Sequence, residues 1–370
     1  MTTATMNNFA RRTLPAGVPI RALIVDDSVV IRRLVTHALT EDPSIEVVGS
    51  AANGRIAMKM IPLTNPDVVT LDIEMPEMNG LETLRAIRAL YPQLIVIMFS
   101  TLSERGAAIT LEALTLGAND YVAKAANAGS LDVSMSRLRD DLIPKMKQFF
   151  RLGKSSALAA VETPASRIAL PPRCSALPGK TIARKAIAIG VSTGGPTALA
   201  ELIPAFPKNF SLPVFIVQHM PPIFTRLLAE RLQTLTKLRV IEASDGIPIE
   251  PGVIYIAPGD QHMRTARHGS EKRLLLDRSE PENFCRPAAD VLFRSVADVY
   301  GGAVIAVILT GMGQDGRRGI ERLRQEGAWV IAQDEASSVV WGMPGAVAKA
   351  GLADSITDLN SIVPEILKLV

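Results

Sequence analysis

The stretch Lys185-Ala-Ile-Ala-Ile-Gly-Val-Ser-Thr-Gly-Gly-Pro196 carries the clearest structural signal in the chain. Its first part, Ala186 to Ile189, is a short apolar run typical of a buried parallel strand. The next five residues, Gly190 to Gly194, fit the G-x-S-x-G pattern, in which a serine sits on a sharp turn between a strand and a helix. The Ser192 hydroxyl would then lie at the carboxyl edge of a sheet, beside backbone N–H groups that could bind an oxyanion. The alternative is a glycine-rich turn with a helix-capping serine.

The composition is that of a globular protein with more than one domain. A length of 370 residues suits two or three domains, and 48% hydrophobic residues can build a large core. The net charge of +3 is too small to indicate a nucleic-acid partner. No stretch approaches the ~20 apolar residues of a membrane span. The two cysteines are far apart in sequence, which indicates a reducing compartment. We therefore expect a cytoplasmic protein without membrane insertion or nucleic acid.

Residues 21–150 alternate between short β-rich runs and helical patterns. This alternation predicts a parallel sheet with helices on both faces and ligands at the carboxyl ends of the strands. Polar residues collect at those ends: Asp26, Asp27, Asp72, Ser100 and Lys124. Three carboxylates at one edge repel one another unless a cation joins them, and Mg²⁺ prefers oxygen ligands. The set suits a phosphoryl group accepted by Asp72, although ordinary strand-end acids are the alternative.

Residues 21–145 resemble a response-regulator receiver domain, which implies a flavodoxin-like (βα)5 fold. The resemblance also implies phosphorylation of Asp72 by a histidine kinase. The matching residues are Asp26-Asp27, Asp72 followed by Met75-Pro76 and Gly80, Ser100, and Tyr121 three residues before Lys124.

The resemblance also implies roles for individual residues in this region. Asp26, Asp27 and Asp72 would hold Mg²⁺, with Glu74 contributing its backbone carbonyl. Ala125 departs from the pattern, since receivers usually carry proline there, and this affects the placement of the preceding lysine. The residues expected to sense the phosphoryl group are Ser100, Lys124 and Tyr121.

Two segments lack a hydrophobic period. We expect residues 1–20 to form a disordered tail rather than a signal peptide. Residues 151–183 are rich in proline, serine and small residues, which is typical of a tether between domains. Such a tether would let the two domains face each other or separate.

Residues 184–370 predict a second α/β domain, with a doubly wound parallel sheet and polar residues at its strand ends. Parallel strands would bring a serine, a histidine and an aspartate to one edge, and acyl transfer requires such a set. The chain order Ser–His–Asp differs from that of α/β-hydrolases, so the geometry would be convergent. The three apolar runs are Ala186–Ile189 leading to Ser192, Val214–Val217 leading to His219, and Ala303–Leu309 leading to Asp315.

The identity of the base is open from the residues alone. His262 also follows a predicted strand, Val253–Ile256, but His219 ends its own strand more directly and is favoured. We expect His37 to be structural and His268 to be solvated in a charged loop, Arg267 to Arg273.

The motifs of this second region resemble the chemotaxis protein-glutamate methylesterases. The resemblance implies Ser192 as nucleophile, His219 as base and Asp315 as its partner, with backbone N–H groups of Thr193 and Met312 at the oxyanion site. Ala288-Ala289 stand where the family often has Ser-Val. The motifs are Gly190–Pro196, Gln218–Pro221, Ile256–Asp260, Arg286-Pro287 with Asp290–Phe293, Leu309–Gly316, and Ala332–Ser337 through Gly342–Pro344.

Together the two resemblances imply a phosphorylation-regulated enzyme that removes methyl esters from receptor glutamates and deamidates receptor glutamines. We expect a monomer with chemotaxis receptors and a histidine kinase as partners, Mg²⁺ for the receiver and no cofactor for the esterase. We hypothesise that the unphosphorylated receiver packs over the edge that holds Ser192. The alternatives are a transcription regulator, although no helix-turn-helix candidate follows residue 183, and a non-catalytic signalling scaffold.

Overall fold

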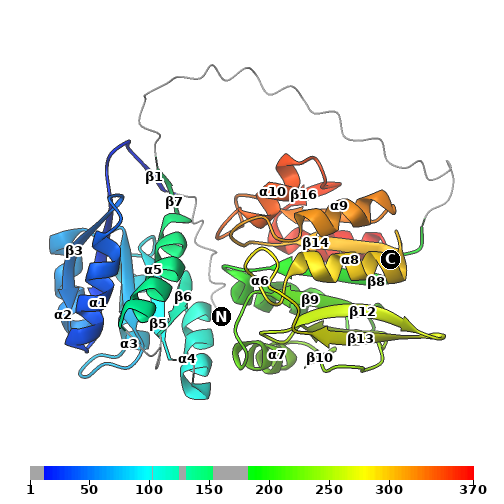
Figure 1. The fold of residues 1–370 in the computed structure, drawn as a ribbon, viewed down its shortest axis with the longest axis horizontal. Coiled ribbons are helices and arrows are strands. Elements are labelled where there is room, and N and C mark those ends of the chain that lie inside the picture. Colours follow the sequence, from blue (N-terminus) through cyan, green and yellow to red (C-terminus); the bar gives the residue numbers. More distant parts are fainter. Residues whose placement is uncertain (1–11, 102, 125–130, 153–181) are drawn as a thin grey trace, which may run out of the picture. The chain divides into compact units, whose positions relative to one another are not determined.

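The computed structural model describes residues 12–101, 103–124, 131–152 and 182–370. The chain forms two compact units, residues 1–161 and 162–370 (Figure 1). The division falls inside the segment predicted as a tether, most of which lies outside the described residues. Among the described helices, none is both long enough and apolar enough to cross a membrane.

The first unit contains the predicted five-stranded parallel sheet, with strand order β3-β2-β4-β5-β6. The flavodoxin-like prediction is therefore confirmed. Its strands are β2 (Ile20–Val25), β3 (Ile45–Ala51), β4 (Val68–Asp72), β5 (Ile95–Ser100) and β6 (Asp120–Ala123), and its helices are α1 (Val29–Thr40), α2 (Gly54–Thr64), α3 (Gly80–Leu90), α4 (Glu104–Thr115) and α5 (Leu131–Lys147).

Side-chain caps fix where the helices of this sheet begin. Ser28, Asn53 and Ser103 each accept a hydrogen bond from a backbone N–H in the first turn of the following helix. Asn79 forms a full capping box with Glu82 at the start of α3. Helices α1, α2 and α4 begin within three or four residues of the carboxyl ends of β2, β3 and β5, and α3 begins at Gly80 after the longer loop that follows Asp72, so the polar residues are held at one edge.

The prediction of a disordered tail over residues 1–20 is wrong for its last part. Arg12–Leu14 form strand β1, which pairs in parallel with β7 (Phe150–Leu152), and Ile20 already begins β2. The ladder between β1 and β7 pairs backbone groups at the two ends of the unit. The partner strand lies at the far end of the unit's sequence, so no local pattern could indicate it.

The second unit is built on a seven-stranded parallel sheet with strand order β10-β11-β9-β8-β14-β15-β16. The predicted doubly wound α/β architecture is confirmed, since helices pack on both faces. The strands are β8 (Ala186–Val191), β9 (Val214–Gln218), β10 (Arg239–Glu242), β11 (Val253–Ile256), β14 (Val304–Ile308), β15 (Trp329–Gln333) and β16 (Ser355–Thr357). The helices are α6 (Gly195–Leu202), a short 3-10 turn η1 (Ile203–Ala205), α7 (Phe224–Leu235), α8 (Ala289–Tyr300), α9 (Arg317–Gln325), α10 (Met343–Lys349) and α11 (Leu359–Lys368).

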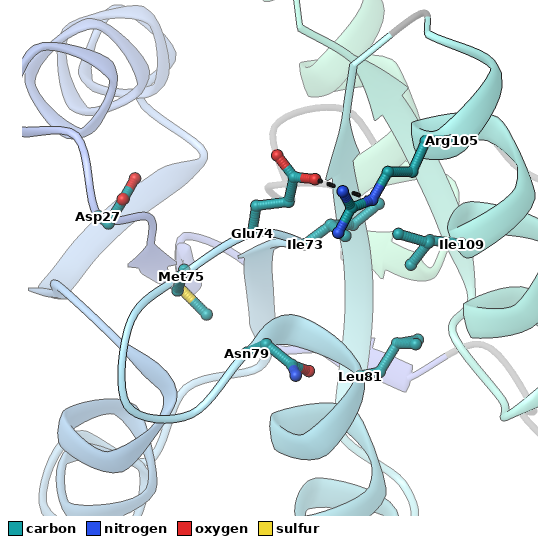
Figure 2. Close-up of a pocket in the computed structure, with 8 residues that line it drawn as sticks. All are labelled: Asp27, Ile73, Glu74, Met75, Asn79, Leu81, Arg105 and Ile109. Atoms are coloured by element: carbon teal, nitrogen blue, oxygen red, sulfur yellow. Dashed lines mark ion pairs between the residues drawn. The ribbon is translucent and has the colours of Figure 1, made fainter.

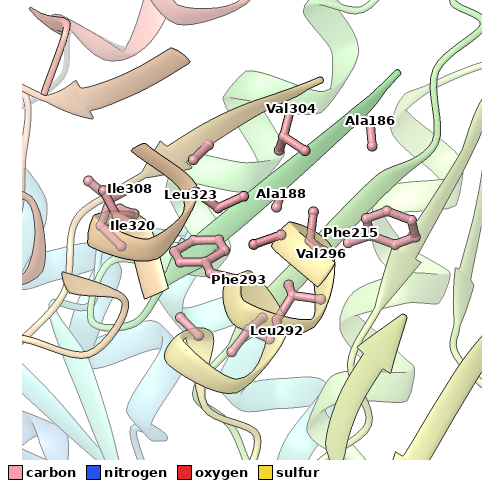
Figure 3. Close-up of a cluster of buried hydrophobic side chains, with 14 of the residues drawn as sticks. Ala186, Ala188, Phe215, Leu292, Phe293, Val296, Val304, Ile308, Ile320 and Leu323 are labelled. Atoms are coloured by element: carbon pink, nitrogen blue, oxygen red, sulfur yellow. The ribbon is translucent and has the colours of Figure 1, made fainter. Parts of the chain in front are cut away.

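One face of this sheet carries a large apolar cluster (Figure 3). Alternate residues of β8 and β14, such as Ala188 and Ala306, point to this face, as the two-residue period of a strand requires. Phe293 of α8 and Leu323 of α9 pack onto them and are fully buried. Small side chains on the strands and large ones on the helices let the two layers approach closely, which fixes α8 and α9 against the sheet.

The charged segment Arg267–Arg273, predicted as a loop, is instead part of an antiparallel hairpin. Strand β12 (His262–His268) pairs with β13 (Glu271–Asp277), and the hairpin packs beside α8. His268 is exposed, as expected. The hairpin forms here because buried and exposed residues alternate along its strands. Met263, Thr265 and Leu274 point inward, while charged residues between them face solvent.

Phe293→Ala should destabilise the second unit by about 3–5 kcal/mol, because a fully buried aromatic ring would leave a cavity under α8. Both tryptophans of the chain, Trp329 and Trp341, lie in this unit, so urea unfolding followed by tryptophan fluorescence reports on it alone. Phe284→Ala is the control: this ring is fully exposed, and its loss should change stability by no more than about 0.5 kcal/mol. Equal losses in the two variants would contradict the packing described.

Candidate functional site

Three neighbouring strands of the second unit bring Ser192, His219 and Asp315 to one edge of the sheet. Ser192 directly follows β8, His219 directly follows β9, and Asp315 lies in the loop between β14 and α9. Strand β8 pairs in parallel with both β9 and β14, so the three carboxyl ends are adjacent. The structure therefore places the serine, the histidine and the aspartate as the sequence predicted.

Backbone hydrogen bonds hold the three strand ends in register. The N–H of His219 donates to the carbonyl of Val191 over 3.2 Å, and the N–H of Ser192 donates to the carbonyl of Thr310 over 3.0 Å. The buried Gln218 amide adds a link, because its Nε2 donates to the carbonyls of Ser192 at 3.0 Å and His219 at 3.3 Å. The positions of the candidate nucleophile and base are thus set by main-chain geometry.

The close approach of these strand ends requires glycine at two positions. A Cβ on Gly311 would lie 2.8 Å from the Cβ of Ser192. A Cβ on Gly195 would lie 1.8 Å from Oε1 of Gln218. Both contacts are closer than real Cβ atoms approach, so any larger residue would move the serine or the amide.

The carboxylate of Asp315 is buried and accepts four hydrogen bonds. Its Oδ2 accepts from Nε2 of His219 at 2.8 Å and from the Ala289 N–H at 2.6 Å. Its Oδ1 accepts from Nδ2 of Asn283 at 2.8 Å and from the Asp290 N–H at 3.1 Å. Burial alone would raise the pKa of Asp315, but these bonds outweigh it and lower the pKa, so the group stays ionised.

His219 faces this carboxylate with one nitrogen only. Burial lowers the pKa of His219, but the bond to Asp315 and a contact with Cys285 outweigh burial and raise its pKa to about 10. Because Nε2 is engaged by Asp315, Nδ1 is the nitrogen left to exchange a proton with Ser192. Within the described residues no hydrogen bond joins the Ser192 hydroxyl to His219, and such bonds often tighten only in the substrate complex.

His262 lies elsewhere and in a different environment. It is fully buried, its Nδ1 accepts from the Ala288 N–H at 3.2 Å, and its Nε2 lies 3.1 Å from the carbonyl of Glu280. Both ring nitrogens therefore serve the local backbone. The geometry favours His219 as the base and assigns His262 a packing role.

The two residues predicted at the oxyanion site differ in surroundings. Thr193 is buried, and its carbonyl accepts from the Thr310 hydroxyl at 2.9 Å. Met312 is 41% exposed, and its N–H has no hydrogen-bond partner among the described residues. Met312 follows Gly311, where an added Cβ would lie 2.8 Å from the Cβ of Ser192, so the chain passes the candidate nucleophile just before Met312.

In the first unit, Asp26, Asp27 and Asp72 form one acidic cluster. A carboxylate oxygen from each lies within 4.8 Å of the others, Asp27 being exposed and the other two buried. The Lys124 ammonium pairs with Oδ2 of Asp26 at 2.9 Å and with Oδ1 of Asp72 at 2.7 Å. Burial and the charge of Asp26 raise the pKa of Asp72, although Lys124 opposes this.

The predicted sensing residues sit at the ends of the neighbouring strands. Ser100 ends β5 and is buried, and its hydroxyl lies 3.1 Å from the carbonyl of Thr101 and 2.6 Å from the Thr110 hydroxyl of α4. Tyr121 lies in β6, where burial raises its pKa well above the usual value. The ammonium of Lys145 lies 5.1 Å from the centre of the Tyr121 ring. Ala125 lies outside the described residues.

A cavity of about 580 Å³ opens beside this cluster (Figure 2). Asp27 and the loop after Asp72 line one side, and Arg105 and Ile109 of α4 line the other. The side chain of Glu74 points to Arg105, at 3.7 Å, which leaves only its backbone carbonyl for the metal role predicted from the resemblance. Of the three acids, Asp27 lines the cavity, and Ile73, the residue after Asp72, lies at its wall.

Both parts of the chain match known family models. Residues 22–135 match the response regulator receiver domain, and residues 187–366 match the CheB methylesterase domain. A protein-glutamate methylesterase/protein-glutamine glutaminase of Trichodesmium erythraeum is 50% identical over 94% of this chain and 98% of its own length. The chain belongs to this methylesterase family.

Other members agree with this assignment. A protein-glutamate methylesterase/protein-glutamine glutaminase of Caulobacter vibrioides is 47% identical over 94% of the chain and 98% of its own length. The crystal structure of the Thermotoga maritima CheB methylesterase catalytic domain matches with 43% identity and a TM-score of 0.50. It covers 51% of this chain and 100% of the solved domain, so an isolated catalytic unit of this family folds by itself.

Sequence reasoning missed several residues around the methylesterase site. Asn283 and Cys285 contact Asp315 and His219, yet the loop that carries them has no strand-end position and no periodic signal. The sequence pattern singles out Ala288 and Ala289, which are fully buried at the start of α8, but it does not indicate that the N–H of Ala289 donates to Asp315. The only available signal was the short polar run before the Arg286-Pro287 motif.

Lys124→Met should destabilise the receiver unit at pH 7 by about 3 kcal/mol, because two buried carboxylates would lose the ammonium they share. The loss should shrink as pH falls, because protonation of Asp72, whose pKa is raised by burial and by the charge of Asp26, removes the negative charge that Lys124 compensates. The transition is seen by circular dichroism and is absent from tryptophan fluorescence.

Lys147→Met is the matched control for this variant. The Lys147–Asp42 pair is more exposed, so its loss should cost about 1 kcal/mol or less. A Lys124→Met receiver as stable as the parent at neutral pH would refute the charge balance described.

Proposed function

We propose that the chain acts in the cytoplasm as a monomeric, phosphorylation-controlled esterase. Its substrates would be glutamyl methyl esters on chemotaxis receptors, and receptor glutamines for deamidation. The observation that carries the proposal is the adjacency of Ser192, His219 and Asp315 at the ends of β8, β9 and β14. The relatives named for these two activities support the choice of substrate.

In the proposed reaction the Ser192 oxygen attacks the ester carbonyl while its proton passes to Nδ1 of His219. Asp315 holds the imidazole by Nε2 and stabilises the imidazolium that forms. The oxyanion would accept from the Met312 N–H and from a backbone N–H at Thr193, and one such donor is typically worth about 3 kcal/mol. The C–O bond breaks, and methanol leaves with the proton from His219.

The second half of the proposed reaction hydrolyses the acyl-enzyme and regenerates the free enzyme. A water molecule gives a proton to His219 and attacks the acyl carbon, which releases the glutamate carboxylate and restores the Ser192 hydroxyl. A glutamine substrate follows the same path with ammonia as leaving group. Only neutral His219 can accept the proton from serine, so the raised pKa of His219 predicts a rate that increases with pH.

The surroundings of the site suit a protein substrate rather than a small enclosed one. Met312 is 41% exposed beside Ser192, and Phe284, one residue from Cys285, is fully exposed. Apolar side chains left in water next to a catalytic edge can be covered by a protein surface that carries the ester. A side chain on a receptor helix could reach Ser192 without entering a deep pocket.

The receiver would control this activity through Asp72. A carboxylate oxygen of Asp72 attacks the phosphorus of a kinase phosphohistidine, and the P–N bond breaks as the acyl phosphate forms. The oxygen donors of Asp26, Asp27 and Asp72 fit Mg²⁺, with the Glu74 carbonyl as a further ligand; the ion, when bound, neutralises charge between carboxylates and phosphoryl oxygens. Lys124 pairs with the new phosphate, and Ser100 exchanges its contacts on α4 for a phosphoryl oxygen.

His219→Ala and Ser192→Ala should each abolish methanol release from methylated receptor membranes, whereas His262→Ala should act mainly on stability. Losing the nucleophile or base leaves only the small residual catalysis of the binding site. His262 instead satisfies buried backbone groups, so its loss should lower the unfolding midpoint seen by tryptophan fluorescence. A folded Ser192→Ala protein with parental activity would disprove the nucleophile, and reversed histidine effects would disprove the base.

A small acyl phosphate with Mg²⁺ should raise methanol release by the full-length protein. Asp72→Asn should remove this response but keep the resting rate, since it alters only the phosphate acceptor. A chelator should act on the parent as Asp72→Asn does, because the acidic cluster then lacks its cation. Stimulation that persists in Asp72→Asn would exclude Asp72 as the switch.

A further inference from the structure

Cys285 is held in a tight turn next to the candidate base. Glu282 and Cys285 exchange two backbone hydrogen bonds, of 3.1 and 2.9 Å, around Asn283 and Phe284. The φ angles of these two central residues are 52° and 63°, the pattern of a type I′ turn. A bulky residue at such a φ is rare, because glycine is usual there.

Both sides of this turn are anchored to the protein. Asn283 donates to Oδ1 of Asp315 at 2.8 Å and to Oδ2 of Asp290 at 2.9 Å. Glu282 pairs with Arg294 of α8 at 2.8 Å. The position of Cys285 is therefore fixed by the same network that holds Asp315.

The anchored turn places Sγ of Cys285 3.5 Å from Nδ1 of His219, within hydrogen-bond range for sulfur. This nitrogen is the one that must take the proton of Ser192, because Asp315 engages the other. The thiol thus engages the nitrogen that the serine hydroxyl requires. The reaction described above gives the thiol no part.

We propose that Cys285 is a positioning residue that holds Nδ1 of His219 in the resting enzyme, so that Ser192 gains this nitrogen only when the thiol gives it up. This inference rests on the proposed esterase function. While the hydrogen bond between Sγ and Nδ1 holds, this nitrogen is engaged and cannot take the proton of Ser192. The serine then lacks a base until the contact with the thiol opens.

The other charged groups that the structure describes near His219 do not contact its Nδ1. Asp315 acts on the opposite nitrogen, from the loop after β14. Asp290 of α8 is engaged by Asn283 and by the Gly319 N–H at 2.6 Å, and Glu282 is neutralised by Arg294. The contact with Cys285 adds to that of Asp315 in raising the pKa of His219.

The first test is the pH dependence of kcat/KM for methanol release by the full-length protein, measured for the parent, Cys285→Ala and Cys285→Ser. Cys285→Ala should move the acid limb to lower pH, and a shift of one unit would raise the rate on that limb about tenfold. Cys285→Ser should lie between, since a hydroxyl on a shorter side-chain bond can still hydrogen-bond to the nitrogen. An acid limb that does not move, or a rate that falls equally at every pH, would overturn the proposal.

The second test does not depend on esterase activity. Iodoacetamide alkylates Cys285 as sulfur forms the S–C bond, iodide leaves and the thiol proton passes to His219. Alkylation of Cys285, followed by mass spectrometry, should therefore slow at least severalfold in His219→Ala, while Cys174 in the same samples should react at an unchanged rate. Equal rates for Cys285 in the parent and His219→Ala would refute the contact. If the parent protein released no methanol but alkylation of Cys285 still slowed in His219→Ala, the contact would stand and only the proposed esterase function would be rejected.

Discussion

The buried carboxylate of Asp315 is the point on which the second unit's site depends. A charge taken out of water is costly unless hydrogen bonds replace its hydration. Here the replacements come from the residue after β9, from the turn at Asn283 and from the first N–H groups of α8. Helix α8 has no side-chain cap of its own, so Asp315 serves as its cap from across the fold and gains from the helix dipole. Alanine at 288 is compatible with this arrangement, because Asp315 accepts the N–H groups that a capping side chain would otherwise accept.

The receiver also buries carboxylates, but it compensates their charge in a different way. Asp26 and Asp72 are buried next to each other, and a cation rather than a set of amides compensates them. The amides around Asp315 are fixed in position. The charge of Asp315 is therefore permanent, and the geometry around it is rigid. A lysine side chain can change partner, so the acidic cluster can accept a new anion and redistribute its contacts. The network around Asp315 is therefore suited to keep its geometry through a reaction. The acidic cluster of the receiver is suited to change its contacts when an anion is added.

Much of both sites could be predicted from the sequence because parallel strands end at a common edge. Asp72, Ser100, Ser192 and His219 each end or directly follow a short apolar run, and that position alone brings distant residues together. The choice between His219 and His262 needed the structure, since both follow strands and only burial and partners separate them. The hairpin β12–β13, strand β1 and the turn at Cys285 were not predictable, because each is set by packing against segments remote in sequence.

The strand order also bears on how the second unit is made in the cell. Strand β14 lies between β8 and β15, yet it follows β9, β10, β11 and the β12–β13 hairpin in the chain. While a ribosome synthesises those segments, one edge of the apolar strand β8 has no partner. Open edges of this kind pair readily with other chains, and long-range parallel pairing is slow. The edge of β8 stays open until β14 pairs with it, and the loop that follows β14 then brings Asp315 to the ends of β8 and β9, so the sheet and the charge network at its edge are completed together.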